Sequence, residues 1–232
     1  DGFIAASAQA RRTFWADRGR TAAIAAHTNA FKINEDVVIP IDRLADYSEG
    51  VERINIRRSL DNKLDILDAV RAYLSGPMTE LQDRSDYQAR EDFSASAEGD
   101  SILERKRRAA LAHLDAVKAR WLRLREALDE PAKRHPECLA DVPADVIGEA
   151  DTLMQLLLRR DLVVSYHREV AAKLGEIYDG RDLEPVRRRL ESIHQAGRQS
   201  RLFVALHMHA GDGNVHTNIP VNSNDYKMMR SG

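Results

Sequence analysis

The chain has 232 residues, of which 43% are hydrophobic and 31% charged, so it is long enough for one large domain or two small ones. Its 35 basic residues balance 37 acidic ones, and a formal net charge of −2 gives no electrostatic basis for binding nucleic acid or an anionic membrane. The single cysteine, Cys138, excludes an intramolecular disulfide and a CxxC site. No apolar run approaches the roughly 20 residues of a membrane span, and no signal segment opens the chain, so we expect a cytoplasmic protein without a transmembrane segment.

The first zone, residues 1–56, predicts a helix followed by a strand. Residues 5–27 are rich in alanine, which favours a helix. Branched and aromatic residues then cluster near 31–39 and stop at Pro40, a pattern typical of a strand. Asp42 is a suitable N-cap for the helix that follows.

The second zone, residues 57–199, predicts helices that pack together as antiparallel hairpins. Apolar residues recur there at intervals of three, four and seven, which places one apolar face on each helix. Segments 91–101 and 130–145 interrupt the pattern, and a last helix is expected from near Asp182 to near Gly197, with Pro185 in its first turn. The three apolar stripes are Leu60, Leu64, Leu67, Leu74 and Leu81; Leu103, Ala110, Leu114, Val117, Trp121, Leu124 and Leu128; and Leu153, Leu157, Val164, Ala171, Leu174 and Tyr178.

The third zone, residues 200–232, predicts a hairpin with strands near 201–209 and 214–221. Asp212-Gly213 is a strong signal for a two-residue turn, because a type I′ turn needs positive φ at both central positions. With that turn, His209 faces His216. The whole chain is therefore expected to be α+β, predominantly α by residue count, with a small antiparallel sheet and a large helical insertion.

Alternation along the hairpin gathers His207, His209, His216 and Asn218 on one face and apolar residues on the other. Opposed side chains on paired strands are roughly 4.5–5.5 Å apart at Cβ, so two imidazoles there can share a divalent ion. Zinc sites commonly have three protein ligands, so a further ligand is needed from elsewhere. Histidines on an exposed strand face are also commonly solvated, and that interpretation stays open.

The motif from His209 to Asn218, HAGDGNVHTN, resembles the HxGDGNxHxN signature of FAD-dependent 2-hydroxyacid dehydrogenases. These are flavoproteins of the vanillyl-alcohol-oxidase type, such as D-lactate dehydrogenases, the glycolate oxidase subunit and D-2-hydroxyglutarate dehydrogenase. Residues 14–40 are similar to the start of that family's C-terminal, substrate-side domain. The resemblance implies a ferredoxin-like sheet portion, and oxidation of a D-2-hydroxy acid, D-lactate or a similar one, to the 2-oxo acid with FAD as cofactor.

The resemblance also assigns roles to individual residues. It implies that His209 and His216 bind zinc or another divalent metal and that Asn218 contacts substrate. It implies that Arg18 clamps the substrate carboxylate and that Lys32 contacts substrate as well. Cationic side chains suit the anion of a 2-hydroxy acid, and a Lewis acid near its hydroxyl favours the alkoxide.

Two parts of the family pattern are not found in this sequence. The family's third metal ligand and catalytic base lie in a Glu-His-Gly motif, and no such tripeptide follows Asn218. No GxGxxG fingerprint or P-loop is present. We therefore expect a fragment that contains no catalytic residue, is inactive alone and has a FAD-binding domain of the full-length protein as its partner. The full-length protein could also lie against the inner membrane.

Two other functions remain open at this stage. The chain could be a helical interaction module that binds a partner or forms homo-oligomers through its helices, an association expected to be lost when Trp121 or Leu124 becomes charged. It could also be a free-standing metal hydrolase, although the missing third ligand argues against this. The basic run Arg105 to Arg108 shares its expected helix with acidic residues such as Glu104 and Asp115, and it is interpreted as a solvated face.

Overall fold

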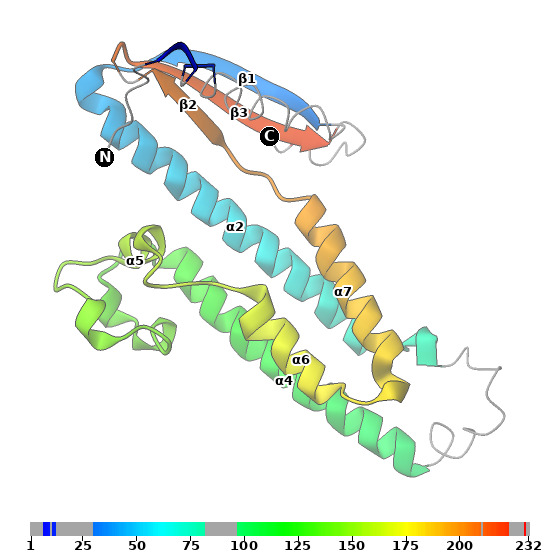
Figure 1. Cartoon of the computed structure of the whole chain (residues 1–232). Helices are drawn as coiled ribbons and strands as arrows, with labels where there is room; N and C mark the ends of the chain where they lie inside the picture. The colour runs from blue at the N-terminus through cyan, green and yellow to red at the C-terminus, as the bar shows by residue number, and fades with distance from the viewer. Residues whose placement is uncertain are drawn as a thin grey trace. The chain divides into compact units, whose positions relative to one another are not determined.

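The computed structural model describes residues 7–9, 11–12, 30–81, 97–209, 211–222 and 230. The chain divides into two compact units (Figure 1). Asp1–Leu44 and Leu202–Gly232 together form the sheet unit, and Ala45–Arg201 forms the helical unit. Most of the helix predicted over 5–27, including Arg18, lies outside the described residues.

The sheet unit contains three antiparallel strands, β1 (Ala30–Val38), β2 (Ala205–His209) and β3 (Asn214–Asn222). Their order is β1-β3-β2, so β3 is central and pairs with both other strands. This confirms the α+β class with a small antiparallel sheet. β2 is shorter than the expected strand near 201–209, because residues 201–204 have no regular structure.

The register between β2 and β3 differs by two residues from the prediction. His207, not His209, lies opposite His216, and His209 lies opposite Asn214. The prediction of a directly opposed His209–His216 pair is therefore wrong. Four residues, 210–213, connect the strands instead of two, and within this connection the amide of Asp212 donates to the carbonyl of His209 at 3.1 Å. A shift of two residues leaves every side chain on its predicted face.

The helical unit is built on two long helices, α2 (Leu44–Ser75) and α4 (Ala97–Glu126), followed by α5 (Leu153–Arg159), α6 (Ala172–Ile177) and α7 (Glu184–Gln199). The N-terminus of α4 lies inside the segment 91–101 for which a break was predicted. Residue 56, the boundary of the first zone, lies inside α2. A π-helical turn, His167–Ala171, precedes α6. The 3₁₀ turns are Ile41–Arg43, Thr79–Leu81, Ala132–Arg134, Pro136–Cys138, Ala144–Val146 and Arg181–Leu183.

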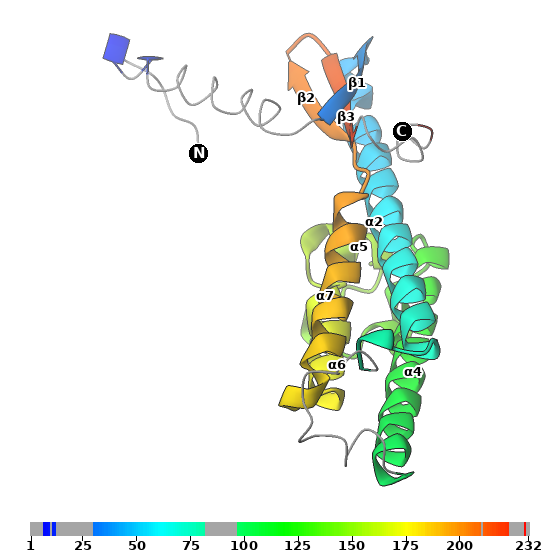
Figure 2. The same ribbon diagram turned by 90° about the vertical axis from the view of Figure 1, so that its right-hand side faces the viewer.

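Helix α7 packs beside α2, as Figure 2 shows. The side-chain amide of Asn62 on α2 donates to the carbonyl of Gly197 on α7 at 2.8 Å. A Cβ atom at position 197 would lie 2.3 Å from Ile66, so the close approach requires glycine there. The predicted helix with Pro185 in its first turn is confirmed by α7. Proline is tolerated at that position because the amide it lacks would have no partner within the helix.

The predicted apolar stripes form the core of the helical unit. Their members on α2 and α4 are almost all buried, and Trp121 and Leu124 are fully so. Both residues pack inside their own unit, so a charged side chain at either position would disturb the core of that unit. Among the described residues, none of the helices combines the length and hydropathy needed to cross a membrane.

Candidate functional site

One face of the three-stranded sheet gathers polar residues from all three strands, and we call it the polar face. Strand alternation and the observed register define it, because residues paired across strands share a face. Its opposite face is mainly apolar and includes Val215 and Val221, which are buried, with Glu35 and Thr217 as polar members. The polar face consists of Asn34 and Asp36 on β1, His207 and His209 on β2, and His216 and Asn218 on β3, and the backbone position of Lys32 belongs to it.

Three imidazole rings lie together on the polar face. The ring centroids of His207 and His209 are 5.3 Å apart, and those of His207 and His216 are 5.8 Å apart. The centroids of His209 and His216 are 5.7 Å apart, so the three rings form a nearly equilateral triangle. The rings of His207 and His209 belong to exposed residues, whereas the side chain of His216 is 29% exposed.

Asp36 on β1 forms a hydrogen bond with one nitrogen of the His216 ring. Its carboxylate oxygen Oδ1 lies 2.6 Å from Nδ1 of His216, directly across the β1–β3 pair. Because a carboxylate can only accept, the ring nitrogen is the donor, which leaves Nε2 free to bind another group. Asn34 also donates from its side-chain amide to the same oxygen, at 3.4 Å.

The glycine-rich connection is held against the end of β1. The amide of Ile39 donates to the carbonyl of Gly213 at 2.8 Å, and Gly213 has a φ of +73°. The side chain of Asp212 accepts from the amide of Asn214 at 3.1 Å, which forms a local turn. Residues of the motif between the histidines therefore shape the backbone that sets β2 beside β3.

The structure brings together some of the predicted site residues. His209, His216 and Asn218 share the polar face, and the backbone position of Lys32, paired with Pro220, belongs to the same face. Arg18 lies outside the described residues. Asp36 was not predicted, and Glu35 beside it interrupts the alternation of polar and apolar residues that could have placed Asp36 on this face. Within the described ranges, no three histidine, cysteine, aspartate or glutamate side chains converge as metal ligands.

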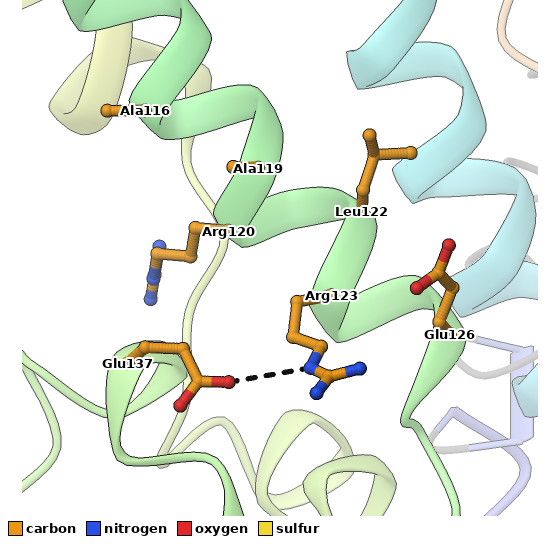
Figure 3. A pocket seen from close by; sticks show the side chains of 7 residues that line it. All are labelled: Ala116, Ala119, Arg120, Leu122, Arg123, Glu126 and Glu137. Carbon is orange, nitrogen blue, oxygen red and sulfur yellow. Dashed lines mark ion pairs between the residues drawn. The ribbon is translucent and has the colours of Figure 1, made fainter.

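A separate pocket of about 650 Å³ lies in the helical unit between α4 and the turn Pro136–Cys138 (Figure 3). Its two arginines already have acidic partners, because Arg123 pairs with Glu137 at 3.5 Å and Arg120 pairs with Glu169. None of the predicted site residues lies there. The lining residues are Ala116, Ala119, Arg120, Leu122, Arg123, Glu126 and Glu137.

The comparison with protein families concerns the N-terminal part of the chain. Residues 1–66 match the family "FAD linked oxidases, C-terminal domain". The matched segment contains β1, the strand that pairs with β3 on the polar face. The match supports part of an FAD-linked oxidase, and hence an oxidoreductase with FAD as cofactor, a FAD-binding partner domain and a small-molecule substrate. No curated protein and no solved structure matches the chain.

Proposed function

We propose that the chain is the substrate-side domain of an FAD-dependent dehydrogenase that oxidises a D-2-hydroxy acid, such as D-lactate, to the 2-oxo acid. One observation carries the proposal. The strand β1, from the segment that matches FAD-linked oxidases, pairs with the strand that holds His216 and Asn218 of the HxGDGNxHxN motif. Two regions far apart in the sequence, each with its own likeness to flavoprotein oxidases, thus form one polar surface.

In the proposed site, the chain binds and orients the substrate. Arg18 and Lys32 hold the carboxylate, because a cationic side chain stabilises an anion and a guanidinium can do so through two parallel hydrogen bonds. Asn218 orients the substrate through its amide. His209 and His216 bind zinc or another divalent metal beside the hydroxyl.

Imidazole nitrogens such as those of His209 and His216 are common ligands of zinc and of other divalent transition metals, but the described residues form no complete three-ligand site. The metal would act as a Lewis acid that favours the ionised form of the substrate hydroxyl. FAD, bound by a separate domain, would accept the hydride from C2 of the substrate. We assign no catalytic base to this chain.

The test is an oxidation assay with the chain and a FAD-binding domain, supplied separately or by extending the chain. D-lactate is the substrate, and an artificial electron acceptor reports turnover. We expect His209→Ala and His216→Ala to abolish turnover, whereas His167→Ala, an exposed histidine of the helical unit, leaves it unchanged. L-lactate serves as the control for stereochemistry.

Two outcomes contradict different parts of the proposal. If His209→Ala and His216→Ala both turn over substrate as fast as the unsubstituted protein, the assignment of these two residues to the site is refuted. If none of the D-2-hydroxy acids tested reduces the flavin, the proposed substrate class is refuted. The coarser relation to FAD-linked oxidases is then unaffected, because it rests on the family match.

A further inference from the structure

We propose that Lys63 is a nucleophilic amine that forms a Schiff base with a small carbonyl compound bearing an anionic group, and that Arg201 holds the anionic group. A 2-oxo acid has both features. Lys63 and Arg201 belong to the helical unit, and neither is part of the polar face. The inference therefore stands independently of the proposed function.

The hydrogen-bond partner of Lys63 is the first observation. Its Nζ atom donates to Oγ of Ser59, one turn earlier on α2, at 2.7 Å. A hydroxyl fixes the position of the amine without supplying the negative charge that stabilises an ammonium ion. Among the other lysines whose contacts are described, Lys118, Lys133 and Lys173 donate to the carboxylates of Asp68, Glu149 and Glu176, and Lys106 donates to the carbonyl of Ile177.

The packing of α2 against the end of α7 is the second observation. Asn62, directly before Lys63, donates to the carbonyl of Gly197, and Ile66, three residues after Lys63, lies against the same glycine. Four residues beyond Gly197 is Arg201, which is exposed, whereas Lys63 is half-buried. The amine is therefore partly removed from water beside a guanidinium at the surface.

The charges around Lys63 are the third observation. Burial lowers the pKa of Lys63, and the charge of Arg201 lowers it further, while the charge of Glu169 acts in the opposite direction. The carboxylate of Glu169 is engaged elsewhere, because it accepts from the indole of Trp121 at 2.8 Å and from the amide of Ser165 at 2.7 Å. Desolvation or a neighbouring cation activates a lysine for Schiff-base chemistry, because more of the amine is then uncharged at neutral pH.

The reaction needs no oxidant or reductant. The lone pair of Nζ of Lys63 attacks the carbonyl carbon, a C–N bond forms, and the π pair of the carbonyl moves to its oxygen. Transfer of one proton from nitrogen to that oxygen gives a carbinolamine. Loss of the hydroxyl group together with the second proton on nitrogen releases one water molecule and leaves the C=N bond. The hydroxyl of Ser59 can relay these protons, since it already contacts Nζ.

Arg201 determines the class of carbonyl compound. A guanidinium stays charged at any physiological pH and can hold a carboxylate through two parallel hydrogen bonds. In a 2-oxo acid the carboxylate is bonded directly to the carbonyl carbon, so an acid held by Arg201 presents that carbon to the neighbouring amine. We therefore expect 2-oxo acids to react at Lys63 in preference to neutral ketones of similar size.

The experiment traps the Schiff base in the 232-residue chain. The chain is incubated at pH 7 with pyruvate and sodium cyanoborohydride, which reduces the C=N bond to a stable secondary amine, and peptide mapping by mass spectrometry locates each adduct. We expect at least about fivefold more adduct at Lys63 than at Lys118 or Lys173. As the pH rises, the yield at Lys63 should level off earlier than the yields at these two lysines. Lys63→Arg should remove this adduct alone.

Hydroxyacetone tests the role of Arg201, because it has a hydroxymethyl group in place of the carboxylate of pyruvate. The ratio of pyruvate adduct to hydroxyacetone adduct should be at least about threefold higher at Lys63 than at Lys173. Arg201→Gln should lower the ratio at Lys63 to the value at Lys173. Arg188→Gln, which changes an exposed arginine of α7, is the matched control and should leave the ratio unchanged. Circular dichroism checks that each variant is folded.

Each part of the inference has its own contrary result. If Lys63 carries no more adduct than Lys118 and Lys173, its role as a nucleophile is refuted. This comparison uses the unsubstituted chain and so does not depend on the folding of a variant. If Arg201→Gln keeps the ratio of the two adducts at Lys63, the role of Arg201 is refuted. Neither result bears on the oxidation of a D-2-hydroxy acid, which is assayed separately.

Discussion

Replacing Gly213 with alanine should open the sheet beside the proposed site. Gly213 has a φ of +73°, and a Cβ atom at this position would lie 2.1 Å from the carbonyl oxygen of Ile39. That oxygen belongs to the backbone, so it cannot move aside as a flexible side chain can. The alanine methyl must therefore push the end of β1 away from the connection between β2 and β3.

The size of the effect follows from two contributions. A left-handed conformation costs a residue with Cβ about 1–2 kcal/mol. Moving Ile39 also breaks the hydrogen bond from its amide to the carbonyl of Gly213, which is 2.8 Å long and contributes about 1 kcal/mol. Together these give a loss of about 2–3 kcal/mol in the stability of the sheet, which corresponds to about 30- to 150-fold easier opening.

The assay is amide hydrogen exchange in β1 and β3, because local opening of the sheet sets the exchange rates there. Gly211→Ala is the matched control, since Gly211 lies in the same connection and a Cβ atom there meets nothing within 4 Å. We expect Gly211→Ala to leave exchange unchanged or slower. Equal exchange rates in the two variants would refute the argument from the close approach to Ile39.

Three further predictions concern the helical unit. Glu169→Ala should lower the unfolding free energy of the helical unit by about 3 kcal/mol, because the side chains of Arg120 and Trp121 lose their acceptor. Calorimetry should then show a melting temperature about 6–12 °C lower. A shift of less than about one degree would contradict this prediction. The bidentate hydrogen bonds from Arg159 lower the pKa of Asp151 from 3.8 to about 2, so this stabilisation is complete above pH 3.8 and is lost as the pH falls toward 2. Thermal melts at pH 5 and pH 2 should therefore differ less in Asp151→Asn than in the unsubstituted chain, and equal differences would count against the contact. Burial raises the pKa of the Cys138 thiol, so Ellman's reagent should react with it only after urea unfolds the chain, and rapid labelling of the native chain would show that the thiol is accessible.

Periodicity predicted the helices well, because packing alone decides which residues of a helix face a core. Leu67, Leu114 and Trp121 were placed on apolar stripes from their spacing, and all three are buried. The ends of the helices were harder to predict. The start of α4 at Ala97 falls in a polar segment whose serines and glycine favour a break, and the packing of the rest of α4 outweighs that local preference.

The faces of the hairpin followed from the sequence, but the pairing did not. His207 and His216 stay on the same face for any change of the strand register by an even number of residues. The alternation of apolar and polar residues along each strand was therefore enough to predict their face. Which residues lie opposite each other depends on the length of the connection, and Asp212-Gly213 suggested a shorter turn than the one formed. Asp36 was missed because an acidic residue on a strand is usually solvated, and only the pairing of β1 with β3 reveals its contact with His216.

The central strand β3 joins β1, which lies about 180 residues earlier in the chain, to β2, which directly precedes it. During synthesis on the ribosome, β1 leaves the exit tunnel long before β3 exists and must wait unpaired while the intervening helices emerge. Closing so large a loop is slow compared with forming local helices. The contact between Asp36 and His216 should therefore be among the last to form, which makes its appearance a natural marker for the completion of folding.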